Sequence, residues 1–251
     1  MSGHSKWSQI KRQKGANDQK RGALFTKLTR EIIVAARQGG GDVEGNYRLR
    51  IAIEKAREAS MPADNIKRAV ERATGGGEAE ALEEITYEGF GPNNVAVIVE
   101  TMTDNRNRTA GEIRSVFNKA GGSLAPVAWQ FEQRGVISVP LNGQDPDEVT
   151  LAAIDAGATD VSSPEAGAIV VYTAPSDLQR VRQALEAGGY AAASAELSME
   201  PTTTVDLPDE RTARQTLKFV ETLEDLDDVQ NVYANFDIPG ELMERLEASV
   251  A

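Results

Sequence analysis

The spacing of apolar residues changes at the glycine run 75–77, and this change constrains the fold more than any other feature of the chain. Before the run, apolar residues such as Leu24, Leu28 and Ile32 recur every four positions, which is the period of a helix with one buried face. After it, short β-rich runs alternate with helical stretches. We therefore expect a helical N-terminal part followed by a mixed α and β remainder.

Three helices are expected in the N-terminal part. Their apolar positions are Leu24, Leu28, Ile32 and Ala36 in the first, Leu49, Ala52, Ile53 and Ala56 in the second, and Ile66, Ala69, Val70 and Ala73 in the third. Glycine runs at 39–41 and 75–77 are expected to end the first and third helices. Asp64 or Asn65 is the expected N-cap of the third helix.

The remainder predicts two small α/β lobes, because a strand–helix–strand order occurs twice. Strands are expected at 95–101, 136–139, 168–173 and 229–236, and helices at 107–120, 146–156, 176–187 and 208–226. Segments 142–146 and 201–208 combine proline with turn-forming residues, so they are the expected crossings between the lobes. The fold class is then α+β with three domains: 1–78, 79–140 together with 201–251, and an inserted domain at 141–200.

Charge is segregated along the chain. Residues 1–75 hold sixteen basic and eight acidic residues, a net charge of +8, whereas the whole chain has a net charge of -12. A basic terminal block in an otherwise acidic chain is typical of nucleic-acid binding. The alternative is that the basic block docks on the acidic remainder of its own chain.

The composition excludes several function classes. Cysteine is absent, which removes disulfides and cysteine nucleophiles and favours a reducing compartment such as the cytoplasm. No apolar run reaches the roughly 18 residues of a membrane-spanning helix. His4 is the only histidine, and the glycine runs do not lead into the Gly-Lys-Ser/Thr of a phosphate-binding loop. We expect no catalytic residues, no metal, no cofactor, no membrane and no small-molecule substrate.

The candidate nucleic-acid contacts are the basic residues of the N-terminal block, with one aromatic residue and one histidine among them, and two arginines in the polar run 103–109. They are His4, Lys6, Trp7, Lys11, Arg12, Lys14, Lys20, Arg21, Lys27, Arg30, Arg106 and Arg108.

Two of these candidates have alternative interpretations. Trp7 can stack on an unpaired base, or it can anchor the N-terminal segment against the first helix. The run 103–109 can form a second contact, or it can be a turn in which Asp104 or Asn105 caps a helix.

Eight short blocks of the sequence are similar to one known family. They are GHSKW at 3–7, IK at 10–11, KRG at 20–22, FTKL at 25–28, GGGD at 39–42, MPADNI at 61–66, YEGFGP at 87–92 and TDNRNRT at 103–109. In this order they resemble the YebC/PmpR family, whose members are described as transcriptional regulators. The family's mitochondrial relative is the translational activator of cytochrome c oxidase subunit I.

The resemblance implies a helical domain and two α/β domains, the third inserted within the second, in a cytoplasmic and non-enzymatic protein. It also implies a nucleic-acid partner, either promoter DNA or the translating ribosome. We therefore expect a regulator of gene expression that binds DNA. The alternative is a ribosome-associated translation factor whose basic arm contacts ribosomal RNA or tRNA.

A helix-turn-helix formed by the second and third helices would suit DNA, but the linker 59–64 between them contains Pro62 and lacks a clear turn glycine. The third helix would then offer Lys67, Arg68 and Arg72 to phosphates or bases.

Overall fold

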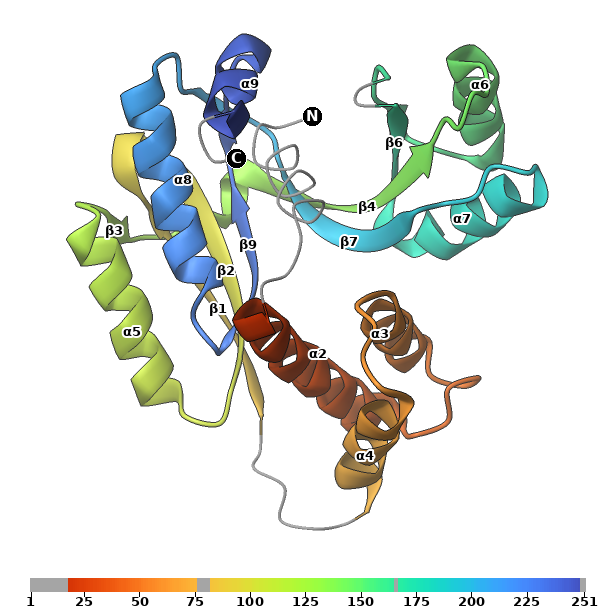
Figure 1. Ribbon diagram of the computed structural model, residues 1–251, viewed down its shortest axis with the longest axis horizontal. Helices are drawn as coiled ribbons and strands as arrows, with labels where there is room; N and C mark the ends of the chain where they lie inside the picture. The colour runs from red at the N-terminus through yellow and green to blue at the C-terminus, as the bar shows by residue number, and fades with distance from the viewer. Residues whose placement is uncertain (1–17, 76–81, 165–166, 249–251) are drawn as a thin grey trace. The chain divides into compact units, whose positions relative to one another are not determined.

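The structure is a computed structural model that describes residues 18–75, 82–164 and 167–248 (Figure 1). A helical N-terminal part is followed by two four-stranded antiparallel sheets, each with its own helices. This confirms the expected α+β class and the order of a helical part followed by two lobes. The described residues separate into two compact units, one made of Ala128–Val205 and Asn235–Asp237 and one made of the rest.

The helical part consists of α2 (Asp18–Gly39), α3 (Tyr47–Glu58) and α4 (Ala63–Thr74). Their shared core is apolar, and its buried residues are Leu28, Ile32, Ile33, Ala35, Ala36, Leu49, Ala52, Ile53, Ala56, Met61, Ile66 and Ala69. These include most of the positions that the helical spacing identified. The sequence pattern therefore predicted the helices and most of the faces that they bury, but Leu24, expected on the buried face of the first helix, is exposed.

Asn46 joins the end of α2 to the start of α3. Its side-chain oxygen accepts a hydrogen bond from the Leu49 amide at 3.1 Å, and its Nδ2 donates to the carbonyls of Ala35 and Gly40, each at 2.8 Å. The side chain thus satisfies groups at two helix ends that have no partner within their helices. A Cβ on Gly39 would lie 2.6 Å from Asn46 Nδ2, so this close approach requires glycine.

The expected N-cap of α4 was wrong. The helix begins directly after Pro62, which makes no side-chain capping bond, and Asp64 lies in the first turn. The Pro62 carbonyl instead accepts from the amides of Asn65 and Ile66 at 2.9 and 3.3 Å. Proline suits this position because its fixed φ is compatible with a helix start.

The first sheet contains β1 (Glu83–Phe90), β2 (Ala96–Thr103), β3 (Ser123–Leu124) and β9 (Val229–Ala234), in the order β3-β1-β2-β9. Helices α5 (Arg106–Lys119) and α8 (Glu210–Glu224) lie over this sheet (Figure 1). They meet where the rings of Phe117 and Phe219 pack edge to face, with centroids 5.1 Å apart.

The second sheet contains β4 (Phe131–Pro140), β5 (Asp160–Val161), β6 (Ala168–Thr173) and β7 (Ser194–Pro201), in the order β5-β6-β4-β7. Helices α6 (Pro146–Ala156) and α7 (Leu178–Ala187) cover it. Because β4 pairs with both β6 and β7, the inserted unit begins at Ala128 and not at the expected residue 141. Segment 142–146 connects β4 to α6 inside that unit.

The remaining elements are short. Strands β8 (Val205–Asp206) and β10 (Phe236–Asp237) form a two-stranded sheet, and single 3-10 turns occur at Pro92–Asn94, Ala128–Gln130 and Pro175–Asp177. Helix α9 (Gly240–Ala248) buries Leu242 and Leu246.

Two glycines provide a matched test of packing in the first sheet. A Cβ on Gly89 would lie 2.5 Å from the Ser123 carbonyl oxygen of the paired strand β3, whereas a Cβ on Gly111 in α5 would meet nothing within 4 Å. We expect Gly89→Ala to lower the free energy of unfolding by about 1–3 kcal/mol. Gly111→Ala should raise it by roughly 0.5–1 kcal/mol, because alanine favours the helix. Urea denaturation of both variants tests this, and equal effects would contradict the close β1–β3 approach.

Candidate nucleic-acid interface

Two of the predicted contact residues, Lys27 and Arg30 on α2, bind the last residue of α8 and the acidic turn that follows it. Lys27 Nζ donates to the Glu224 carbonyl, and an Arg30 guanidinium nitrogen donates to the Asp227 carbonyl. Carbonyls at the end of a helix lack partners within it and carry the negative end of the helix dipole, so cations are favourable there. This part of the basic block therefore docks on the acidic remainder of the chain, as the alternative interpretation expected.

A buried carboxylate, Asp228, lies at the centre of this contact. Its side chain is only 2% exposed and accepts hydrogen bonds from the Thr103 hydroxyl at 3.0 Å and the Thr109 hydroxyl at 2.6 Å. Arg108 donates to both carboxylate oxygens, at 3.1 and 2.8 Å, and Arg30 lies 2.9 Å from one of them. We call these five residues the Asp228 cluster. It joins α2, the end of β2, the start of α5 and the start of β9.

The cluster holds Asp228 in its charged form. Burial by itself would raise the pKa of Asp228, but hydrogen bonds from Thr109, Arg108 and Thr103, together with the charge of Arg30, outweigh burial and lower it. The pKa of Arg108 is raised, first by its hydrogen bond to Asp228 and then by the one to Asp104. Two predicted nucleic-acid contacts, Arg30 and Arg108, thus have an acidic partner within the chain.

Arg106 lies in a different environment from Arg108. It is the first residue of α5 and is exposed. The N-cap of α5 is Asn105, whose side chain accepts from the Arg108 amide at 3.1 Å. The interpretation of this run as a turn and helix cap is therefore confirmed, and Arg106 stays a predicted contact.

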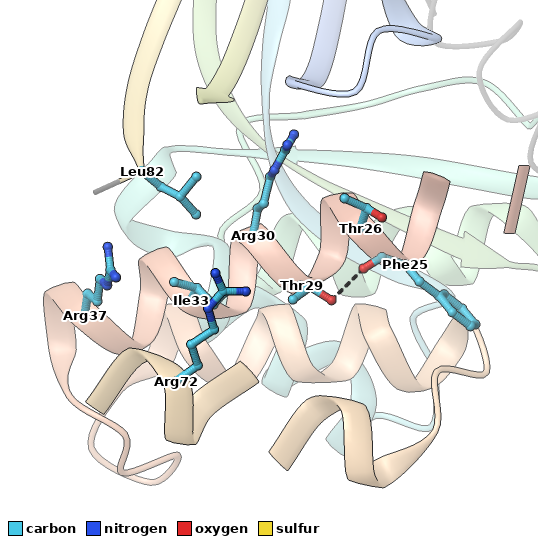
Figure 2. A pocket seen from close by; sticks show the side chains of 8 residues that line it. All are labelled: Phe25, Thr26, Thr29, Arg30, Ile33, Arg37, Arg72 and Leu82. Carbon is cyan, nitrogen blue, oxygen red and sulfur yellow. Dashed lines mark hydrogen bonds between the residues drawn. The ribbon is translucent and has the colours of Figure 1, made fainter. Parts of the chain in front are cut away.

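An open groove of about 330 Å³ lies along α2 (Figure 2). We call it the arginine groove, because the three charged side chains among the described residues that line it are arginines. The lining residues are Phe25, Thr26, Thr29, Arg30, Ile33, Arg37, Arg72 and Leu82. Figure 2 shows Arg72 reaching from α4 toward α2, and Thr29 donating to the Phe25 carbonyl at 2.7 Å.

Other cations of the helical part face solvent. Arg57 at the end of α3 and Lys67 and Arg68 on α4 are exposed. Lys67 also forms an exposed ion pair with Glu71 at 3.7 Å. Arg48 forms an ion pair with Glu84 of β1, and hydrogen bonding to Arg48 lowers the pKa of Glu84. The exposed cations on α3 and α4 therefore remain accessible to a polyanion.

The structure does not describe every predicted contact. Those outside the described residues are His4, Lys6, Trp7, Lys11, Arg12 and Lys14. Lys20 and Arg21 belong to the first turn of α2.

Sequence reasoning missed Asp228 and did not select Arg37. Asp228 belongs to the acidic run 224–228, which looks like solvated surface. Only its position directly before the buried strand β9 distinguishes it from the neighbouring acids.

Within the described part of the chain, no group of three or more His, Cys, Asp or Glu side chains is arranged to hold a metal ion. None of its helices is both long and apolar enough to cross a membrane.

Comparison with known proteins identifies close relatives. The family description "TACO1/YebC protein N-terminal domain" matches residues 5–76, and "TACO1/YebC second and third domain" matches residues 82–236. A "Probable transcriptional regulatory protein" of Moorella thermoacetica is 53% identical, covering 98% of this chain and 100% of the relative. One of the same description from Rubrobacter xylanophilus is 56% identical, covering 97% and 98%.

A solved structure is also similar. The crystal structure of a conserved hypothetical protein from Aquifex aeolicus matches with a TM-score of 0.80 and 47% identity, covering 88% of this chain and 92% of that one.

Replacing the buried carboxylate should weaken the fold. Asp228→Asn removes the buried charge that Arg30 and Arg108 share, and Arg108 keeps only its ion pair with Asp104, so we expect the free energy of unfolding to fall by about 2–3 kcal/mol. The matched control is Asp227→Asn, because Asp227 is exposed and contributes its backbone carbonyl to Arg30. Urea denaturation at neutral pH measures both, and an equally small effect for the two variants would contradict the central role of Asp228.

The same variant should change the response to acid. The pKa of Asp228 is lowered in the folded state. The stabilisation that its charge contributes is therefore fully present above about pH 3.8, the pKa of the group in the unfolded chain, and is lost as the pH falls through the lower pKa of the folded state. The difference in unfolding free energy between wild type and Asp228→Asn should stay constant from pH 7 to about pH 5 and narrow below about pH 4. Denaturation series over this range would show a widening difference if the sign were wrong.

Proposed function

The chain belongs to the TACO1/YebC family, and we propose that it is a non-enzymatic, nucleic-acid-binding regulator of transcription that contacts DNA. The proposal extends the resemblance to the YebC/PmpR family that the sequence blocks indicated. The observation that carries it is the concentration of positive charge at one end of an acidic chain.

Charge supports the proposal because DNA affinity arises largely from neutralised phosphates. Residues 1–75 carry +8, so the remaining residues carry -20, and an acidic remainder disfavours contact with phosphate outside the basic part. The exposed cations Arg57, Lys67 and Arg68 supply phosphate contacts in the described region. We place the remaining contacts on the predicted residues of the arm (residues 1–17), on Lys20 and Arg21, and on Arg106.

The names of the relatives favour transcription as the level of action. Helices α3 and α4 are separated by the short segment 59–62, in which Ser60 adopts a positive φ of 60°. A helix-turn-helix often has glycine at such a position, and here serine takes it. The absence of cysteine supports a cytoplasmic location.

Salt dependence is the first test of the proposal. If the arm makes about four phosphate contacts, affinity for a DNA duplex should fall about a hundredfold between 50 and 200 mM salt. Fluorescence anisotropy with a labelled duplex of mixed sequence measures this. A flat salt profile would contradict electrostatic binding.

A triple charge reversal locates the contact. Lys11→Glu, Arg12→Glu and Lys14→Glu together should abolish duplex binding while the free energy of unfolding changes by less than about 0.5 kcal/mol, because the proposal assigns these charges to nucleic acid and not to the fold. The matched control is Lys119→Glu, Arg211→Glu and Lys218→Glu, which makes the same charge change at exposed positions of α5 and α8.

Binding retained by the control and lost by the arm variant supports the proposal. Equal losses would assign binding to net charge alone. Binding of wild-type protein to ribosomes and not to the duplex would move the function to translation.

A further inference from the structure

We propose that the arginine groove is a second phosphate-binding site, which takes the phosphodiester backbone of a nucleic-acid strand. Arg37 and Arg72 are its phosphate ligands. The inference rests on the proposed function and deepens it, because it assigns a contact in the described helical domain that is separate from the arm.

The sequence spacing of α2 places the groove along one face of the helix. Thr26, Arg30, Ile33 and Arg37 lie at i, i+4, i+7 and i+11, and therefore share that face over about 16 Å. Arg72 adds a third guanidinium from α4, a separate helix (Figure 2). The groove is thus an extended surface that two elements of one folded core support, and it suits a chain better than a compact ion.

The hydrogen-bond donors that line the groove favour an anion as its ligand. Thr26 and Thr29 already donate their hydroxyls to the carbonyls of Gly22 and Phe25, so the guanidinium groups are the remaining strong donors. Arg37 and Arg72 also interact within the chain, but each guanidinium has five N–H donors in a fork that matches phosphate. A phosphate can therefore bind in addition to, or in exchange for, these internal contacts.

The apolar wall distinguishes the groove from the other exposed cations. Phe25, Ile33 and Leu82 line it beside the arginines, and no acidic side chain does so among the described residues. Contacts between charges strengthen where water is partly excluded, and an apolar surface also suits a sugar or base face. Arg57 and Lys67 do not line the groove, so they lack this environment.

The groove is also continuous with the Asp228 cluster, because Arg30 belongs to both. The 2.9 Å contact between Arg30 and Asp228 holds Arg30 beside the acidic turn, so Arg37 and Arg72 are the cations to test. Arg30 itself is unsuitable for substitution, since its loss would disturb the cluster.

The test compares Arg37→Ala with Arg72→Ala, made together in the full chain, against Arg211→Ala with Lys218→Ala as the charge-matched control, since both control residues are exposed on α8 and lie outside the groove and the proposed contacts. Binding to a labelled oligothymidine single strand and to a duplex is measured by anisotropy at several salt concentrations. Losing two phosphate contacts should make the slope of log affinity against log salt shallower by about 1.4 on the single strand and about 1.8 on the duplex. The control should keep the wild-type slope.

The two nucleic acids identify the source of the phosphate. A slope change on the single strand alone assigns the groove to unpaired nucleic acid, and a change on the duplex assigns it to the duplex backbone. Inorganic phosphate added as a competitor should displace nucleic acid less from the Ala pair than from wild type. Binding by the Ala pair with the wild-type slope on both nucleic acids overturns the inference.

Failure of this inference is distinguishable from failure of the proposed function. Wild-type binding that the arm variant loses and the groove variant keeps overturns the groove alone. Absence of salt-dependent binding by the wild type overturns both. If the Ala pair lowers the melting temperature, the double variant Arg37→Lys with Arg72→Lys replaces it in the binding assay. Wild-type affinity of this Lys pair would contradict phosphate recognition by the guanidinium forks.

Discussion

The buried carboxylate of Asp228 is the constraint on which the arrangement around the first sheet depends. A charged group that is 2% exposed is tolerated only when its oxygens are fully hydrogen-bonded, and here Thr103, Thr109, Arg108 and Arg30 supply those bonds. The donors come from three places in the chain, since Arg108 and Thr109 are neighbours in α5. One carboxylate therefore positions the end of β2, the first turn of α5 and the middle of α2 together.

This arrangement changes what the charge count means. The sequence gives the N-terminal part a positive net charge, but Lys27, Arg30 and Arg48 bind partners within the chain. Their charge stabilises the contact of α2 and α3 with the following sheet. The cations that face solvent or line the groove are a subset of the described ones, and we propose that these contact a polyanion, although Arg37, Arg72 and Lys67 also interact within the chain. Charge segregation thus serves both folding and, as we propose, binding.

The same helix connects these two uses. One face of α2 contributes Leu28, Ile32 and Ala36 to the core of the helical part. Another face carries Arg30 and Arg37 along the arginine groove. Because Asp228 holds Arg30, the helix that lines the groove is anchored by an ion pair as well as by apolar packing. A contact surface on such a helix is pre-organised, which lowers the entropic cost of binding.

The sequence by itself determined the features that depend on local pattern. Helical spacing predicted α2 and α3, α6 was predicted with its observed bounds, and the motif blocks identified the family. Strands β1 and β7 were missed, because each contains two or more glutamates and neither has a continuous apolar run, so the segments resemble a surface loop until a neighbouring strand pairs with them. Only the tertiary structure decided that β4 belongs to the inserted unit and that Arg30 and Arg108 share Asp228. Periodicity reports how near neighbours pack, whereas these pairings join residues far apart in sequence and exist only once the chain has folded.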